Sequence, residues 1–186
     1  KIKDKINFDL TNDQLSTIKE INDDLKSNQK MFRLLQGDVG SGKTIVAFVA
    51  SMNVITSGYQ VCLMAPTEIL AKQHFNQAKK LFDNNINISL LTSKTELKER
   101  KLILNDLSNN YINIIIGTHS LFQEKIEYNN LGLIIIDEQH KFGVKQRKKL
   151  SDKGGKNCDV LVMSATPIPR TLVMTAFGDM DTSIIK

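Results

Sequence analysis

The chain has 186 residues, which is enough for one α/β domain with a sizeable core and too few for two. Its 41% hydrophobic and 24% charged residues exclude an intrinsically disordered chain, and no apolar run approaches the roughly 18 residues that a membrane span requires. The net charge of +5 suits a polyanionic partner, although many basic proteins bind no nucleic acid.

Short apolar runs alternate with amphipathic stretches along the chain. In chain order, we expect a helix that follows the N-cap Thr11 and carries Leu15, Ile18, Ile21 and Leu25, a strand at 31–36, a helix at 43–57, a strand at 61–65, a helix at 68–82, a strand at 86–91, a helix at 96–107, strands at 112–116 and 133–137, a helix at 144–150, a strand at 160–164 and a helix at 170–177. This order predicts an α/β fold with a mostly parallel sheet and helices on both faces. In such a sheet, ligands bind beyond the carboxyl ends of the strands, where the motifs below lie.

Residues 37–44 match the phosphate-binding loop pattern G-x-x-x-x-G-K-[ST], between an expected strand and an expected helix. The glycines let successive backbone N–H groups turn toward phosphate oxygens, and the start of the helix adds the positive end of its dipole. Lys43 would reach the β- and γ-phosphates, and the hydroxyl of Thr44 would bind Mg²⁺. The residues expected to hold the nucleotide, ATP, are Gly37, Gly40, Ser41, Gly42, Lys43 and Thr44.

Another apolar strand ends in two carboxylates, Asp137 and Glu138. The end of a buried parallel strand lies at the same sheet edge as the phosphate loop, so Asp137 could hold Mg²⁺ opposite Thr44. Glu138 could then orient or deprotonate the water that attacks the γ-phosphate. A guanine-reading Asn-Lys-x-Asp motif and a Leu-Ser-Gly-Gly-Gln run do not occur in the sequence, which disfavours a GTPase and a transporter ATPase.

The segment Ser164-Ala165-Thr166 follows the next expected strand, and this order of motifs resembles the first RecA-like motor lobe of superfamily 2 helicases. Three longer segments, at 34–44, 137–147 and 163–170, resemble the RecG-type branched-DNA helicases. The transcription-repair coupling factor shares much of this pattern, but it usually has Glu at the position of Gln139. Lys141 departs from the RecG pattern, which commonly has Arg there, so a bidentate contact would be lost while the charge is kept.

The resemblance implies roles for residues outside the phosphate loop. The implied contacts are Phe8, Thr11 and Gln14 to the adenine base, Pro66, Thr67, Thr118 and His119 to the backbone of a DNA strand, and Gln139, His140, Ser164 and Thr166 in coupling hydrolysis to movement of a neighbouring lobe. Contacts to the sugar-phosphate backbone follow a strand without reading its sequence. The two threonines of the DNA set, Thr67 and Thr118, are also natural helix N-caps.

Some side chains outside the motifs have simpler interpretations. Cys62 and Cys158 lie in apolar stretches without CxxC spacing, so we expect two buried thiols, no disulfide or zinc site, and a reducing cytoplasm. His74 lies between polar residues within a helix, and we expect it at the surface. A basic cluster comprises Lys141, Lys145, Arg147, Lys148 and Lys149. It could contact DNA, contact another domain or form a solvated helix face.

The sequence thus predicts the ATP-binding lobe of an ATP-dependent branched-DNA helicase, using ATP and Mg²⁺. The resemblance implies that a wedge-type DNA-binding domain and a second RecA-like lobe lie outside residues 1–186. Since the second lobe completes the ATP site in this superfamily, we expect the chain alone to bind ATP weakly and hydrolyse little. The alternatives are the corresponding lobe of the coupling factor, a non-motor nucleotide-binding module, and an RNA helicase.

Overall fold

The computed structural model describes residues 9–122, 126–137, 158–166 and 180–186, so the expected helices at 144–150 and 170–177 lie outside the described residues. The helices are α2 (Asn12–Lys26), α3 (Lys43–Thr56), α4 (Glu68–Leu81) and α5 (Leu97–Ser108), with a short 3₁₀ helix, η1 (His119–Phe122). The strands are β1 (Phe32–Gly37), β2 (Gln60–Met64), β3 (Ile88–Leu91), β4 (Ile114–Gly117), β5 (Leu131–Asp137), β6 (Asp159–Ser164) and β7 (Asp181–Ile185).

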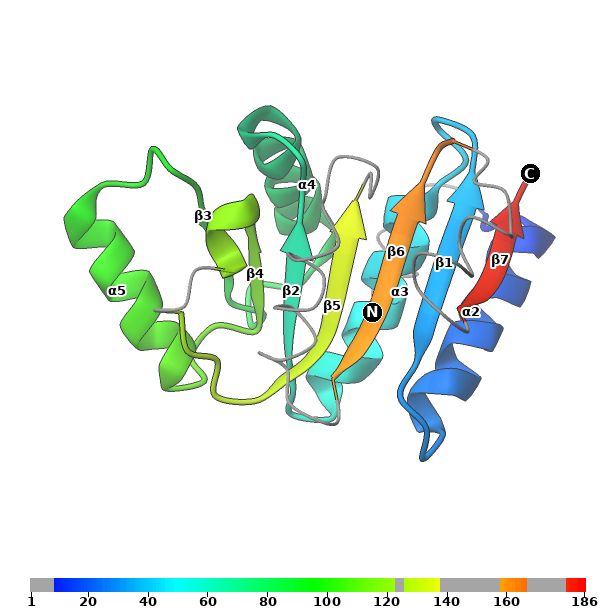
Figure 1. Cartoon of the computed structure of the whole chain (residues 1–186), viewed down its shortest axis with the longest axis horizontal. Coiled ribbons are helices and arrows are strands. Elements are labelled where there is room, and N and C mark those ends of the chain that lie inside the picture. The colour runs from blue at the N-terminus through cyan, green and yellow to red at the C-terminus, as the bar shows by residue number, and fades with distance from the viewer. Residues whose placement is uncertain (1–8, 123–125, 138–157, 167–179) are drawn as a thin grey trace.

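The strands form one seven-stranded sheet in the order β3-β4-β2-β5-β6-β1-β7, and every neighbouring pair is parallel (Figure 1). The expected parallel sheet is therefore confirmed. Within it, β6 separates β1 from β5: Gln36 of β1 pairs with Ser164, and Asp137 of β5 pairs with Met163. This register places the carboxyl ends of β1, β6 and β5 side by side at one edge of the sheet.

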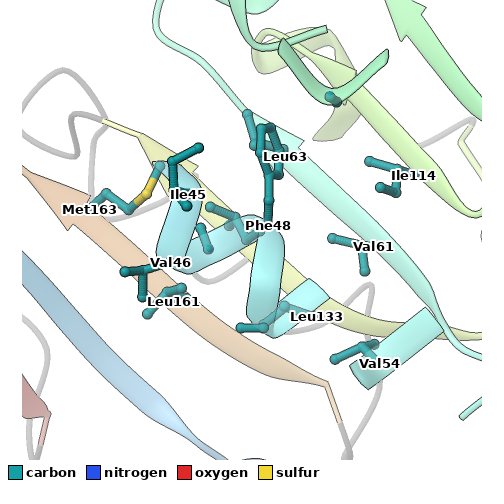
Figure 2. Close-up of a cluster of buried hydrophobic side chains, with 14 of the residues drawn as sticks. Ile45, Val46, Phe48, Val54, Val61, Leu63, Ile114, Leu133, Leu161 and Met163 are labelled. Carbon is teal, nitrogen blue, oxygen red and sulfur yellow. The ribbon is translucent and has the colours of Figure 1, made fainter. Parts of the chain in front are cut away.

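Helices cover both faces, because each buried strand carries apolar side chains on both sides. On β2, Val61 and Leu63 face the core under α2, α3 and α4, whereas Cys62 and Met64 face the core under α5 and η1. Figure 2 shows Val46 and Phe48 of α3 packed over the first of these cores. Among the described residues, no helix has both the length and the apolar content that crossing a bilayer needs.

Strand β7 was not expected from the sequence. Its residues Asp181–Ile185 are mostly polar or exposed, and only Ser183 and Ile185 are buried. The strand pairs with β1 and is attached to α2 by side chains: Ser183 donates a hydrogen bond to Glu20 at 2.5 Å and accepts one from Arg33 at 2.8 Å. Tertiary contacts, which the local pattern does not encode, therefore place this edge strand.

The apolar face of α2 differs from the expectation in one position. Leu15 is 42% exposed, and the buried face instead carries Gln14, Thr17, Ile18 and Ile21. Hydrophobic spacing alone assigns Leu15 to the core, because it cannot show that a polar side chain, Gln14, has a partner in the interior. The buried Gln14 belongs to the site described next.

Candidate nucleotide-binding site

The loop at 37–44 leaves β1 at its carboxyl end and leads directly into α3. Gly40 and Gly42 both have φ of +87°, a left-handed conformation that costs glycine nothing. Gly42 is the N-cap of α3, no side chain caps the helix, and its first turn contains no acidic residue. A glycine N-cap brings no side-chain acceptor of its own to the start of α3, which is the arrangement that leaves a helix start open to phosphate.

Close packing holds this loop. A Cβ atom at Gly37 would lie 2.5 Å from the Ser41 hydroxyl and 2.7 Å from the Ile185 carbonyl oxygen, so only glycine fits there. Among the described residues, two buried polar atoms beside the loop, Gln36 Nε2 and Ser41 Oγ, have no hydrogen-bond partner. Buried polar groups are normally satisfied, so these two atoms suit a site that awaits a polar ligand.

The start of α2 supports the loop through Gln14. Its amide Nε2 donates to the Ser41 carbonyl oxygen at 2.9 Å, and its Oε1 accepts from the Thr11 backbone N–H at 3.0 Å. The Thr11 hydroxyl in turn accepts from the Gln14 N–H at 3.3 Å, which completes a capping box. The expected N-cap is thus confirmed. Of the residues predicted to contact adenine, Gln14 lies against the phosphate loop and Thr11 bonds to Gln14, whereas Phe8 lies outside the described residues.

Lys43 is only 9% exposed, and its ammonium group is engaged within the loop. Its Nζ donates to the carbonyl oxygens of Gly37 at 2.6 Å and Asp38 at 2.8 Å. To reach β- and γ-phosphates, Lys43 would exchange these neutral acceptors for charged ones, which form stronger hydrogen bonds. Thr44 follows in the first turn of α3 and is half-buried.

Asp137 ends β5 and is 8% exposed. Its position in the strand alternation places it on the α4 side of the sheet, where its Oδ2 lies 2.7 Å from His74 Nε2. The prediction that His74 lies at the surface is wrong, since it is 6% exposed. A signal was present in the sequence: Ala71, His74, Ala78 and Leu81 repeat at helical spacing and form the buried face of α4.

These residues fit a magnesium ion that is held mainly by a nucleotide. The described residues contain no group of three or more His, Cys, Asp or Glu side chains that could hold a metal by itself. Mg²⁺ usually takes one or two carboxylates, keeps several waters and binds substrate phosphates. Strand β1, which leads into the phosphate loop, and β5, which ends in Asp137, are two places apart in the sheet, about 10 Å, which leaves room for phosphates and waters between the loop and Asp137.

The coupling residues are only partly described. Ser164 ends β6, between β1 and β5, and its Oγ lies 3.0 Å from the Thr166 hydroxyl and accepts the Thr166 N–H at 3.2 Å. The two residues therefore form a local turn and bond to each other. Glu138, Gln139 and His140 lie outside the described residues, so their expected contacts with this turn stay a prediction.

The segments predicted to contact DNA follow β2 and β4. Thr67 is exposed and caps α4 by accepting the Leu70 N–H at 3.2 Å, and Pro66 before it is half-buried. His119 is exposed at the start of η1, whereas Thr118 is 4% exposed, with its hydroxyl 3.4 Å from Ser120. Three of the four residues thus reach the surface at this edge. Thr118 could contribute there through its backbone but not through its buried hydroxyl.

Glu68, next to Thr67, ties the start of α4 to the loop after β3. The pKa of Glu68 is lowered from its ordinary value, first because the Ser93 hydroxyl donates to its carboxylate and then because Lys94 lies beside it. These contacts measure 2.5 Å and 3.2 Å. The carboxylate is therefore occupied by neighbours, which reduces its repulsion of an anion passing the exposed Thr67.

A polar hollow of about 560 Å³ lies away from all these motifs. Residues from the C-terminal end of α2 and from the α3–β2 turn line it, including Lys26, Asn53 and Tyr59. None of the predicted site residues contributes to its wall. Since it lies by the amino ends of the parallel strands, it is at the edge opposite the phosphate loop.

Comparison with known proteins agrees with this geometry. The DEAD/DEAH box helicase family matches residues 11–175. The ATP-dependent DNA helicase RecG of Streptococcus pneumoniae serotype 4 is 54% identical over 99% of this chain and 27% of its own length. RecG of Staphylococcus epidermidis is 52% identical over 98% of this chain and 27% of its own length.

A solved structure, of RecG bound to a three-way DNA junction, matches 100% of this chain and 25% of its own with a TM-score of 0.86 and 42% identity. The chain thus spans about a quarter of the length of these relatives. Its parallel sheet with helices on both faces is the RecA-like helicase fold, as the sequence predicted. The chain belongs to the DEAD/DEAH box helicase family, and it is similar to RecG helicases over almost all of its residues.

Proposed function

We propose that the chain is the ATP-binding motor lobe of an ATP-dependent branched-DNA helicase or translocase that acts in the cytoplasm in DNA repair, recombination and the processing of stalled forks. The observation that carries this proposal is the placement of a complete phosphate loop and the Asp137 carboxylate at one sheet edge, separated by the strand that ends in Ser164. The 54% identity to RecG of S. pneumoniae supports the choice of DNA as the substrate.

Each residue of the ATP site has a distinct role in this proposal. The amides of the loop and the start of α3 bind the phosphates, and Lys43 neutralises charge on the β- and γ-phosphates. Thr44 and Asp137 would hold Mg²⁺, which would supply positive charge to offset the negative charge that develops during transfer. Glu138 orients or deprotonates the attacking water.

The neighbouring strand ends would carry DNA. Pro66 and Thr67 follow β2, and Thr118 and His119 follow β4, next to one another in the sheet. The exposed side chains of Thr67 and His119 offer donors that suit the phosphates of a single strand, and such contacts position the strand without reading its sequence. ATP and DNA would then occupy adjacent parts of the same edge.

The proposal also assigns the chain a place in a longer protein. Residues 1–186 would be the first RecA-like lobe, working with a wedge-type DNA-binding domain and a second motor lobe of the same protein. The second lobe would supply the rest of the ATP site, so the chain alone would bind ATP weakly and hydrolyse little. Robust DNA-stimulated ATP hydrolysis by these 186 residues would contradict this arrangement.

The decisive experiment measures ATP hydrolysis by the whole protein with forked DNA and with linear DNA of the same length. We expect forked DNA to stimulate hydrolysis more, and Lys43→Ala and Glu138→Gln each to abolish the stimulated rate. Because Glu138→Gln leaves the phosphate loop intact, it should still bind nucleotide. Hydrolysis that is insensitive to both substitutions would remove these residues from the mechanism, and equal stimulation by both DNAs would contradict the branched substrate.

A further inference from the structure

A buried histidine of α4 holds the carboxylate assigned to the metal. His74 Nε2 lies 2.7 Å from Asp137 Oδ2, and the side chains are 7% and 12% exposed. The pair joins residues 63 positions apart in sequence, on an element that covers the sheet and on a central strand. None of the motifs that carry the proposed ATPase site includes His74.

The surroundings of His74 favour an apolar residue. The other buried positions of α4 are Ala71, Ala78 and Leu81, all apolar. A buried polar ring costs free energy unless its nitrogens are hydrogen-bonded, and the second nitrogen, Nδ1, has no partner among the described residues. Packing and solvation therefore do not account for a histidine here, whereas its contact with Asp137 does.

The contact restricts the carboxylate in a way that a metal site requires. With Oδ2 bound to the ring, the Asp137 carboxylate cannot rotate freely, and Oδ1 stays available to the metal or to one of its waters. Metal-binding groups commonly owe their orientation to such outer hydrogen bonds, and loss of the outer partner weakens metal binding. The contact also fixes the orientation of the Asp137 carboxylate relative to α4. This helix begins beside the exposed Thr67, about 10 Å from His74 along the helix axis.

We propose that His74 is a positioning residue: it orients Asp137 for the magnesium ion of the bound nucleotide and ties that orientation to α4. This inference rests on the proposed ATP site. It assigns no proton transfer to His74, which acts only through Asp137. The metal-dependent part of nucleotide binding is therefore the quantity that should respond to a change at position 74.

The test compares the affinity of the chain for a fluorescent ADP analogue in Mg²⁺ and in EDTA. The ratio of the two affinities isolates the contribution of the metal. We expect His74→Leu, which fills the space but cannot hydrogen-bond, to reduce this ratio about tenfold while leaving the affinity in EDTA unchanged. His74→Gln, whose amide can donate to the carboxylate from a similar reach, should recover part of the ratio.

A double-mutant cycle with Asp137→Asn separates positioning from packing. If His74 acts through Asp137, His74→Leu combined with Asp137→Asn should lower the ratio no further than Asp137→Asn alone. Asn76→Leu, an exposed position on the same helix, is the matched control and should leave the ratio unchanged. The proposal would be overturned if the double variant lowered the affinity ratio by the product of the two single effects. It would also be overturned if His74→Leu reduced the affinity equally in Mg²⁺ and in EDTA.

The unsubstituted chain offers a second measurement that does not depend on the folding of any variant. It contains three histidines, so the ring nitrogens of His74 can be assigned by ¹⁵N NMR. Adding Mg²⁺ to the ADP-bound chain should shift the His74 Nε2 resonance, and an unchanged resonance would overturn the proposal. If Asp137→Asn itself leaves the affinity ratio unchanged, the proposed ATP site fails; if only the His74 variants leave it unchanged, the positioning role fails.

Discussion

Gly40 and Gly42 allow two constraints on the phosphate loop to be tested separately: its left-handed backbone conformation and the space left for a side chain. Both have φ of +87°, but a Cβ atom at Gly40 would meet nothing within 4 Å, whereas one at Gly42 would lie 2.4 Å from Gln14 Nε2. The backbone strain of a substitution is therefore shared by the two positions. The collision with the side chain that supports the loop occurs at Gly42 alone.

We expect Gly40→Ala to weaken ADP binding about threefold and Gly42→Ala about tenfold or more, as judged by titration with a fluorescent ADP analogue. Because Gln14 also supports the loop, adding Gln14→Ala should cost less affinity in the Gly42→Ala background, where it removes the colliding atom, than in the Gly40→Ala background. Equal losses at the two glycines, or equal effects of Gln14→Ala in the two backgrounds, would show that the contact between α2 and the loop does not shape the site.

The carboxyl group of Asp159, at the start of β6, should make the free energy of unfolding depend on pH. Desolvation raises its pKa above the ordinary 3.8, outweighing the hydrogen bond from the Met31 N–H. That bond measures 2.7 Å. The folded state therefore holds this proton more tightly than the unfolded state, so its stability falls as pH rises from the ordinary value through the raised pKa.

Asp159→Asn keeps an acceptor for the Met31 N–H and removes the charge. We expect the variant to melt at a higher temperature than the parent at pH 7, because it removes the charge that burial disfavours. The difference should disappear below the ordinary pKa, where both side chains are neutral. Thermal melts by circular dichroism across this range measure it, and a variant that is less stable at pH 7 would contradict the sign.

At the scale of elements, the sequence predicted the central strands well because they are buried on both faces and therefore read as continuous apolar runs. Residues 133–137 and 160–164 fall within the observed β5 and β6 for this reason. Strand β7 has no such run, and the hydrogen bonds of Ser183 that place it come from residues 150 and 163 positions away. The burial of His74 was readable from the helical spacing of Ala71, Ala78 and Leu81, but its partner, Asp137, is adjacent only after folding.

Arg33 of β1 adds side-chain contacts to both α2 and β7. Arg33 is 8% exposed, and it contacts Asp24 at 2.7 Å, Glu20 at 3.1 Å and Ser183 at 2.8 Å. Removing one partner of a buried ion pair is destabilising because it leaves the opposite charge without compensation. Here Glu20 is 46% and Asp24 25% exposed, so water relieves part of that cost.

We therefore expect Arg33→Met to destabilise the chain by about 2 kcal/mol, below the full value for a buried pair, and to lower Tm by about 4–8 °C. Glu20→Gln, which retains the Arg33–Asp24 pair, should cost less than half as much. Hydrogen exchange should report faster exchange in β7 and α2 than in β5. A loss of protection spread evenly over the sheet would contradict a local role for Arg33.

At the scale of the whole molecule, the sheet order divides its functional edge into two parts. The ends of β1, β6 and β5 carry the proposed ATP site, and those of β2 and β4 carry the proposed DNA contacts. Helix α4 belongs to both, because it starts after β2 and contacts the end of β5 through His74. Since the residues outside α4 fall into two separate sets at this edge, substitutions within one set should affect the binding of one ligand only.

His119→Ala in the whole protein should weaken binding of forked DNA about threefold, the value of one hydrogen bond of ordinary strength, and leave ADP affinity unchanged. Lys43→Ala should weaken ADP binding and leave the binding of forked DNA, measured without nucleotide, unchanged. Fluorescence anisotropy with labelled DNA and titration with a fluorescent ADP analogue measure the two quantities. A His119 variant that loses both activities together would show that the division of the edge is not functional.

The uniform direction of the strands also offers a practical opportunity for labelling. Because all neighbouring strands are parallel, the turns at their amino ends lie on the side of the sheet away from both proposed sites. These turns include exposed positions such as Asn28 and Tyr111, while both cysteines of the chain, Cys62 and Cys158, are buried. Burial also raises the pKa of the Cys158 thiol to about 12, which keeps it from reacting. A cysteine introduced at Asn28 could thus carry a fluorophore for single-molecule work without first removing the native thiols.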